Sequence, residues 1–319
     1  MDISVVIPNF NGKHLLEKNL SKVFSIISGY KDGKSEIIIT DDSSKDDSVA
    51  FVKQFIASKR DAAVQLILLE NTSGENKGFS SNVNKGVEKA QGEVVILLNT
   101  DVVPQNDFLQ PLLQHFTSEN VFAVGCMDES IEEGGKTVLR GRGVGKWEKG
   151  FLVHSAGDVT KGSATLWVNG GSGAFRKNIW NRLGGLNVLY NPFYWEDIDL
   201  SYKAQKAGYI VLFENKSIVR HEHEVGSIKK NYSSFFVRKT TYRNQFFFTW
   251  LNATDTILLV NHFIFLPYFL LRAVKNHDRA FFLGFCAALL SLPKVLRERK
   301  KIQKLVKKSD KEVIDYISK

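Results

Sequence analysis

Apolar runs of strand length alternate with amphipathic stretches over the first hundred residues. The strand-like runs are Ile3–Ile7, Glu36–Thr40, Val64–Leu69 and Val94–Leu98. Helix-like patterns fill the intervals, at Lys13–Ser28, Ser48–Ser58 and Phe79–Ala90. Mainly apolar strands separated by helices predict a doubly wound α/β fold, a mostly parallel sheet with helices on both faces. Ligands of such sheets bind beyond the carboxyl ends of the strands.

Polar segments follow each predicted strand at that edge. In chain order they read PNFNG, DDSSKDD, ENTSGENKGFSSN and NTD. Loops between strands and helices are generally polar, and Asp or Ser often caps the next helix. We expect that explanation to hold for Asp46, Asp47 and Ser48. Asp41 and Asp101 lie directly at strand ends, so we expect them to bind a ligand.

The composition indicates a globular protein of a reducing compartment. The chain has 319 residues, of which 43% are hydrophobic and 24% charged, enough for one large domain or two smaller ones. Cys126 and Cys286 lie far apart and form neither a disulfide framework nor a metal-binding spacing. The start MDISVVIP lacks the basic residues and long apolar stretch of a secretory signal, so we expect a cytoplasmic catalytic domain.

Five motifs occur in order along the chain. They are VVIPNFNG, TDDSSKDDS, NKGFSSNVNKGVEKAQGEVVILLNTDV, WVNGGSGAFRK and YWEDIDLSYKAQKAGYIV. Their order and spacing resemble family 2 glycosyltransferases of GT-A fold, most closely the rhamnosyltransferase-like branch, which often carries an Asn-x-Asp triplet. The resemblance implies a catalytic domain over residues 1–228. It also implies inverting transfer of a sugar from a UDP- or dTDP-sugar to a hydroxyl of a glycan or polyprenyl-linked glycan acceptor, in surface polysaccharide synthesis.

The resemblance also implies which residues bind the donor. Asp41 matches the acid that accepts a hydrogen bond from N3–H of uracil or thymine, and Asp42 lies beside it. The glycine-rich turn NGGSGAF is implied to lie beside the sugar and acceptor. The full set implied to contact the nucleotide or sugar is Pro8, Asn9, Asn11, Asp41, Asp42, Asn76, Lys77, Gly78, Asn99, Thr100, Asp101, Gly170 and Gly171.

The triplet Asn99–Asp101 implies a metal site. A hard divalent cation, Mg²⁺ or Mn²⁺, held by oxygen ligands would neutralise the charge of the donor diphosphate. Asp101 is the implied direct ligand. Asn99 replaces the usual first acid and carries no charge, so we expect modest metal affinity. Relatives complete the site with a histidine after a later strand, which implies His221.

The motif WEDIDL supplies the expected catalytic base. Inversion by direct displacement needs one general base to take the proton of the acceptor hydroxyl. The resemblance assigns this role to the second acid of the pair Glu196–Asp197. The motif also opens a predicted helix that ends near Gly208, and the helix dipole would favour the carboxylate form of Asp197. Alternatively, Glu196, Asp197 and Asp199 simply enrich a first helical turn.

The composition changes after residue 228. Thr256–Leu271 is a charge-free run of 16 residues and Ala280–Pro293 one of 14, both short of the roughly 18 to 20 that a spanning helix needs. From Lys294 onward, ten Lys or Arg stand against four Asp or Glu. We expect residues 229–319 to form helices on the cytoplasmic leaflet, making the protein peripheral on the inner face of the cell membrane. A helical subdomain that forms a homo-oligomer interface is the alternative.

Two other functions are alternatives to a glycosyltransferase. A sugar nucleotidyltransferase would need a glycine-rich loop with Arg or Lys directly after the first strand, and PNFNGKHLL is not such a loop. A catalytically silent membrane scaffold would be consistent with Asn99, but it has no use for Asp101 and Asp197 together. The net charge of +9 does not predict nucleic-acid binding, because the charge lies beside apolar runs and no recognition motif accompanies it.

Overall fold

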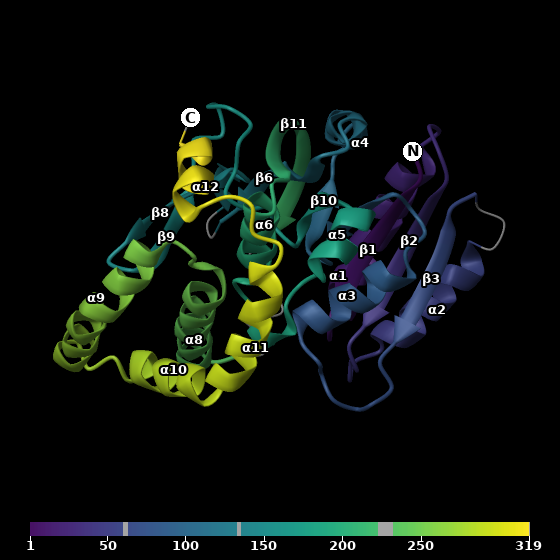
Figure 1. The fold of residues 1–319 in the computed structure, drawn as a ribbon. Helices are drawn as coiled ribbons and strands as arrows, with labels where there is room; N and C mark the ends of the chain where they lie inside the picture. Colours follow the sequence, from purple (N-terminus) through teal and green to yellow (C-terminus); the bar gives the residue numbers. More distant parts are fainter. Residues whose placement is uncertain (60–62, 133–134, 223–231, 319) are drawn as a thin grey trace.

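A mixed β-sheet forms the centre of the computed structural model (Figure 1). Among the described residues, 1–59, 63–132, 135–222 and 232–318, nine strands share this sheet in the order β3-β2-β1-β4-β10-β6-β11-β5, with β7 paired to β6. The strands are β1 (Ile3–Asn9), β2 (Ser35–Asp41), β3 (Gln65–Glu70), β4 (Val94–Leu98), β5 (Val102–Pro104), β6 (Val121–Ile131), β7 (Thr137–Arg140), β10 (Ser172–Arg176) and β11 (Ile210–Glu222). A separate hairpin joins β8 (Gly143–Glu148) and β9 (Phe151–Ala156).

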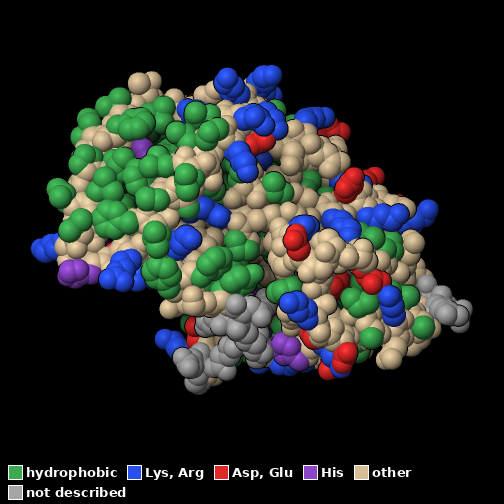
Figure 2. All heavy atoms as spheres, turned by 90° about the horizontal axis from the view of Figure 1, so that it is seen from below, with side chains coloured by type: hydrophobic (Ala, Val, Ile, Leu, Met, Phe, Trp, Pro, Cys, Tyr) green, Lys and Arg blue, Asp and Glu red, His purple; other side chains and the backbone are tan. Residues whose placement is uncertain are grey.

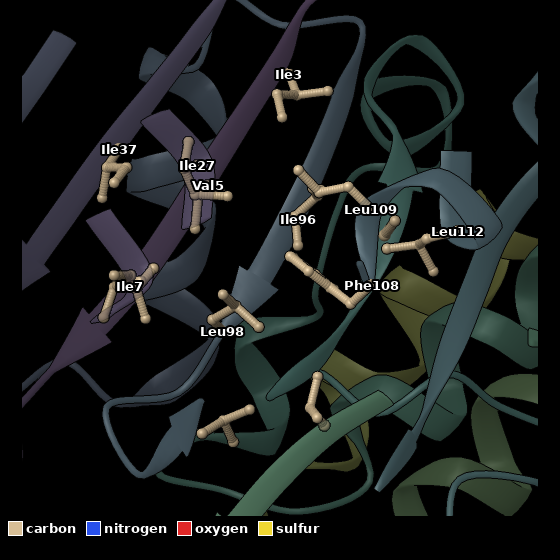
Figure 3. Packing of buried hydrophobic residues seen from close by; sticks show 14 of the residues in the cluster. Ile3, Val5, Ile7, Ile27, Ile37, Ile96, Leu98, Phe108, Leu109 and Leu112 are labelled. Carbon is tan, nitrogen blue, oxygen red and sulfur yellow. The ribbon is translucent and has the colours of Figure 1, made fainter. Parts of the chain in front are cut away.

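The first four strands are parallel and covered on both faces, as the sequence pattern predicts. Alternate residues of a strand point to opposite faces, so Val5 joins the cluster under α1 (Lys13–Ser28) and α2 (Ser48–Ser58), while Val6 joins the cluster under α3 (Phe79–Lys89). Figure 3 shows the first cluster, with Ile7 and other apolar side chains in contact. Strong burial on both faces fixes the register of this half of the sheet.

The second half of the sheet is mixed. Strand β10 lies antiparallel between β4 and β6, while β11 runs parallel to β6 and antiparallel to β5. Helical segments that connect or cover this half are α4 (Leu109–Leu113), η1 (Gln114–Thr117), α5 (Lys177–Leu183), η3 (Val188–Tyr190) and α6 (Glu196–Lys206). Strand β11 therefore runs in the same direction as β4, and both strands end at the same edge of the sheet.

The C-terminal helices pack on the rest of the protein. They are α8 (Ser234–Asn252), α9 (Thr256–Lys275), α10 (Arg279–Leu290), α11 (Leu292–Gln303) and α12 (Asp310–Ile317). Phe248 of α8 and Val313 of α12 share one apolar cluster with Leu152 of β9 and Tyr202 of α6. The boundary predicted at residue 228 therefore separates two chain segments that contribute to a single core cluster.

Helix α9 extends beyond the charge-free run that the sequence shows. It is 20 residues long, and by length and composition alone it could cross a membrane. In the described part of the chain a second segment meets the same test only if α10 and α11, bent by 67° at their junction, are taken as one span. Gly284 of α10 lies against the backbone of Lys239 in α8, so the small residues of α10 permit close helix packing.

A buried ion pair ties α12 to the end of α6. Lys206 Nζ lies 2.8 Å from Asp310 Oδ1, and both side chains are almost fully buried. Asp310 also accepts hydrogen bonds from the Tyr202 hydroxyl at 2.7 Å and from the backbone N–H groups of Thr254 and Asp255. Both oxygens of this carboxylate therefore accept hydrogen bonds.

Replacing Asp310 should destabilise the whole protein. Asp310→Ala leaves the Lys206 ammonium buried without its counter-charge, so we expect the free energy of unfolding to fall by about 3–5 kcal/mol. Urea denaturation measures this change. Asp315→Ala, on the exposed side of the same helix, is the control and should shift the value by less than about 0.5 kcal/mol. Equal effects of the two substitutions would contradict the structural role of the pair.

Candidate active site

A cavity of about 390 Å³ lies at the carboxyl ends of β1 and β4. Most of the residues predicted for the site line it: Pro8, Asn9, Asp42, Asn76, Asn99, Thr100, Asp101, Gly170, Gly171, Glu196, Asp197 and His221. Asn169, the first residue of the predicted glycine-rich turn, also lines the cavity. The sequence did not predict a further set of lining residues: Phe10, Phe79, Asn82, Pro192, Phe193, Tyr194 and Tyr232. The cavity therefore brings together residues from the first strand to the beginning of α8.

The two neighbouring acids at the end of β2 have different positions. Asp41 is buried and does not line the cavity; its carboxylate accepts hydrogen bonds from Asn9 Nδ2 at 2.7 Å and from the backbone of Ser44 at 2.9 Å. Asp42 does line the cavity, and its carboxylate accepts from the backbone N–H groups of Lys77 and Gly78. Asp41 thus joins the first two loops, and Asp42 joins the second loop to the third.

Three other predicted donor-binding residues also lie outside the cavity lining. Asn11 bridges the first two loops: its N–H donates to Ser44 Oγ at 2.8 Å and its side-chain oxygen accepts from the backbone of Lys45 at 2.7 Å. Lys77 and Gly78 contribute backbone N–H groups, which donate hydrogen bonds to the carboxylate of Asp42 in the cavity lining. Gly78 has φ +90° and a Cβ there would lie within 2.9 Å of the Asn191 side chain, so glycine fits this position.

His221 lies between two carboxylates at the edge of the sheet. Its Nε2 is 3.3 Å from Asp101 Oδ2, and its Nδ1 is 3.1 Å from Asp128 Oδ2. The strand register explains this arrangement, because the antiparallel pairing of β11 with β5 places His221 opposite Val102, the residue after Asp101. Burial lowers the pKa of His221, but Asp101 and Asp128 outweigh burial and raise the pKa to about 9.

Asp101 and His221 fit the expected metal site. A carboxylate oxygen and an imidazole nitrogen that face each other are ligands that Mn²⁺ accepts, and a carboxylate behind the ring, here Asp128, commonly orients a metal-bound histidine. Within the described ranges no group of three or more His, Cys, Asp or Glu could hold a metal ion. The remaining ligands would therefore have to come from the diphosphate and water.

The triplet residue Asn99 lies against the glycine-rich turn. A Cβ on Gly171 would lie 2.4 Å from Asn99 Nδ2, so any larger residue there would displace the Asn99 side chain. The backbone N–H of Asn99 also donates to the carbonyl oxygen of Gly171 at 2.9 Å. The turn predicted beside the sugar therefore contacts the triplet predicted beside the diphosphate.

Glu196 and Asp197 lie in the first turn of α6, directly after two residues with a strained backbone. Tyr194 and Trp195 have φ of +72° and +78°, a left-handed backbone conformation that residues other than glycine rarely adopt. The strained turn aims both acids at the cavity. Asp197 accepts from the backbone of Ile198 at 2.8 Å, and the N–H of Gly170 points at it from 3.5 Å.

Burial determines the protonation of the acid pair. Burial and then the neighbouring Asp197 raise the pKa of Glu196 to about 8. Burial also raises the pKa of Asp197, and the backbone N–H groups of Ile198 and Gly170 oppose that rise. The helix N-terminus predicts that Asp197 favours its carboxylate form, whereas in the structure desolvation has the larger effect. Within the described residues, Asn9 Oδ1 and Glu196 Oε2 are buried without hydrogen-bond partners, so a ligand could satisfy these two atoms.

A single side chain of α8 holds the strained loop. The fully buried Asn244 Nδ2 lies 3.0, 2.9 and 2.8 Å from the carbonyl oxygens of Tyr190, Phe193 and Tyr194. Arg243 Nη2 adds a hydrogen bond of 2.6 Å to the carbonyl oxygen of Asn191. These contacts join the C-terminal helices to the segment that carries the acid pair.

Comparison with known proteins identifies the family. A family model described as "Glycosyl transferase family 2" matches residues 4–183, more than half of the chain. The chain belongs to glycosyl transferase family 2. It is 23% identical over 226 residues to the O-antigen chain rhamnosyltransferase RfbN of Salmonella typhimurium, covering 70% of this chain and 67% of the relative. The predicted resemblance to the family and to its rhamnosyltransferases is confirmed.

A second relative of this family 2 chain is named as an enzyme of lipid-linked glycans. The GalNAc(5)-diNAcBac-PP-undecaprenol beta-1,3-glucosyltransferase of Campylobacter jejuni is 33% identical over 112 residues, which are 35% of this chain and 33% of the relative. The chain therefore spans about a third of that protein and two thirds of the rhamnosyltransferase.

Solved structures confirm the GT-A fold of the chain. The mannosyltransferase PcManGT from Pyrobaculum calidifontis, in complex with GDP-Man and Mn²⁺, has a TM-score of 0.58 at 19% identity, covering 95% of this chain and 84% of that one. S. aureus TarS 1-349, in complex with UDP-GlcNAc, has a TM-score of 0.58 at 14% identity, covering 99% and 84%. At these identities the similarity shows the fold.

The raised pKa of Glu196 predicts a pH-dependent stability. Since the folded protein holds this proton more tightly than the unfolded chain does, the stability that protonation provides is complete below pH 4.5 and is lost as the pH rises through about 8. Glu196→Gln removes the dependence, because the amide stays neutral. We expect the variant to match the wild-type Tm at pH 5 and to exceed it by at least about 2 °C at pH 9.

Differential scanning fluorimetry across this range measures the effect, with the exposed substitution Glu119→Gln as control. A constant Tm difference between Glu196→Gln and the wild type at all pH values would show that folding does not raise the pKa of Glu196.

Proposed function

We propose that the protein is an inverting glycosyltransferase that moves a hexosyl or deoxyhexosyl group from a UDP- or dTDP-sugar to a hydroxyl of a glycan or lipid-linked glycan in surface polysaccharide synthesis. One observation carries the proposal: a single cavity holds both the Asp101–His221 pair and the Glu196–Asp197 pair. The first pair suits a leaving diphosphate and the second suits an acceptor hydroxyl. The family, the relatives named above and neighbours solved with UDP-GlcNAc or GDP-Man support the assignment.

The strand-end loops would bind the nucleotide. Asp41 fixes the loop after β2, and Asp42 lines the cavity beside Asn9 and Asn76. We therefore assign contact with the nucleobase to Asp42 and a positioning role to Asp41. A carboxylate acceptor at this place would favour uracil or thymine, which offer an N3–H donor, over cytosine, which offers none there.

Asp101 and His221 would hold Mg²⁺ or Mn²⁺ together with the diphosphate. When bound, the cation neutralises the charge that develops on the leaving diphosphate. Asp128 fixes the imidazole with Nε2 toward Asp101, because its own oxygen takes the Nδ1 side of the ring. Asn99 contributes a neutral amide, so the protein supplies less negative charge to the cation than an Asp-x-Asp triplet would.

Asp197 would take the proton of the attacking hydroxyl. The buried pair divides two roles: Glu196, whose pKa is about 8, keeps its proton near neutral pH, and Asp197 is the group that ionises. A protonated Glu196 avoids a second negative charge beside the base. Burial leaves the Asp197 carboxylate weakly solvated, which makes it a stronger base than an exposed aspartate.

The acceptor would be presented at the inner face of the cell membrane. A polyprenyl-linked glycan fits the chemistry, because its sugar hydroxyl can enter the cavity while its lipid stays in the leaflet. The relative named for a PP-undecaprenol glycan supports this choice. A peripheral enzyme would then work on the cytoplasmic side, where nucleotide sugars are available.

Loss of Asp101 should weaken donor binding only when metal is present. We expect Asp101→Ala to raise the Kd of UDP by about 10- to 100-fold in Mn²⁺ and to leave it nearly unchanged in EDTA. Isothermal titration calorimetry measures both values. The exposed Asp107→Ala is the matched control. Equal affinity of the wild type and Asp101→Ala in Mn²⁺ would exclude Asp101 as a metal ligand.

Loss of the base should spare donor binding. We expect Asp197→Asn to keep the UDP affinity of the wild type and to reduce kcat by about 10²- to 10⁴-fold, since the amide cannot accept the hydroxyl proton. A UDP-release assay with the full chain measures turnover, and Asp158→Asn at an exposed site serves as control. Full turnover by Asp197→Asn would exclude the assignment.

A further inference from the structure

Helices α9 and α10 leave a large apolar surface exposed. We define the apolar face by its six most exposed side chains, each at least 60% exposed: Ile257, Phe263, Ile264, Leu271, Val274 and Leu290. Figure 2 shows hydrophobic side chains gathered over one side of the molecule in the view from below Figure 1. A continuous apolar surface of this kind normally marks a contact with a membrane or a protein.

The described residues do not cover the apolar face. Only 11% of the most apolar 18-residue stretch of α9 is buried. The buried side of the helix includes His262, whose ring accepts from Trp250 Nε1 at 3.0 Å and lies 3.1 Å from the carbonyl oxygen of Gly150. One side of α9 is therefore fixed to the protein, and the opposite side has no cover among the described residues.

The attachment of α9 favours a helix that lies in the interface over one that spans the bilayer. A spanning helix needs apolar surroundings along its whole length. Gly150 sits so close that a Cβ on it would lie 2.1 Å from His262 Cα, and the same hairpin carries the charged residues Lys146, Glu148 and Lys149. Insertion of α9 across the membrane would draw this charged hairpin into hydrocarbon.

Exposed cations border the apolar face. Arg272, Lys275 and Arg279 lie at the turn between α9 and α10 and are exposed, whereas the nearby acid Asp278 is paired with Arg238 at 2.8 Å. Helix α11 adds exposed Lys and Arg directly after Leu290. An apolar face bordered by exposed positive charge complements a leaflet of anionic lipid, which attracts Lys and Arg side chains near its surface.

We propose that the apolar face docks the enzyme on an anionic bilayer, with α9 and α10 lying in the headgroup region. In Figure 1, β1 runs from the labelled N terminus toward the side on which α10 lies, so the carboxyl ends of the strands, and the cavity with them, turn toward the membrane side. The proposal deepens the proposed function, on which it rests for its purpose: docking would bring the cavity to a lipid-linked acceptor.

Vesicle co-sedimentation of the full chain tests the docking. We expect the wild type to bind phosphatidylcholine vesicles that contain phosphatidylglycerol, and to bind at least about tenfold less well to phosphatidylcholine alone or in high salt. Phe263→Glu and Leu271→Glu should each reduce binding to anionic vesicles by at least about tenfold. Leu139→Glu, at a similarly exposed apolar site on β7, is the matched control and should bind as the wild type does.

Two further readouts separate the outcomes. Nucleotide binding without vesicles tests the proposed function alone, so intact UDP binding by a wild type that ignores anionic vesicles would overturn the docking and leave the function standing. Light scattering tests whether a second copy of the chain, rather than a membrane, covers the apolar face. A wild-type dimer that Phe263→Glu converts to a monomer, together with no vesicle binding, would assign the apolar face to a second copy of the chain and overturn the proposal.

Discussion

The buried contacts that hold helix α6 are the constraint on which the site depends. Asn244 fixes the strained loop that precedes the helix, Asn252 donates to Asp199 within its first turn at 2.6 Å, and Lys206 at its end pairs with Asp310 at 2.8 Å. Asn244, Asn252 and Asp310 all belong to the C-terminal helices. A left-handed Trp195 persists only where surrounding contacts enforce it. The acid pair is therefore positioned by residues far away in the sequence.

The first half of the fold follows from local pattern, and the rest depends on long-range pairing. Strand β4 and the predicted helices Lys13–Ser28 and Ser48–Ser58 have the predicted bounds, because apolar periodicity and burial agree there. Motifs located most of the cavity lining. They did not distinguish Asp42, which lines the cavity, from Asp41, which is buried behind it, because neighbouring residues on a strand point to opposite faces. In the sequence, Asp128 stands out only as an acid within an apolar strand, which is weak evidence for a site residue.

The C-terminal helices have an inner and an outer surface, and the two differ in role. The inner surface of α8 holds the loop of the acid pair, and the outer surface of α9 and α10 carries the apolar face. This division explains why the segment is rich in aromatic and apolar residues without a long uninterrupted run. Part of that content packs against Leu152 and Tyr202, and part stays exposed. The C-terminal helices thus pack as part of the folded protein, and the proposed membrane contact would use only their outer surface.

The most direct test of the account is a calorimetric panel of UDP, dTDP, GDP and CDP, each titrated into the full chain with and without Mn²⁺. We expect selective binding of UDP or dTDP that Mn²⁺ strengthens, since Asp42 lines the cavity at the proposed nucleobase site and Asp101 with His221 suits the cation. Binding of no nucleotide in either condition would contradict it. That result would favour a catalytically silent member of the family that acts as a membrane scaffold.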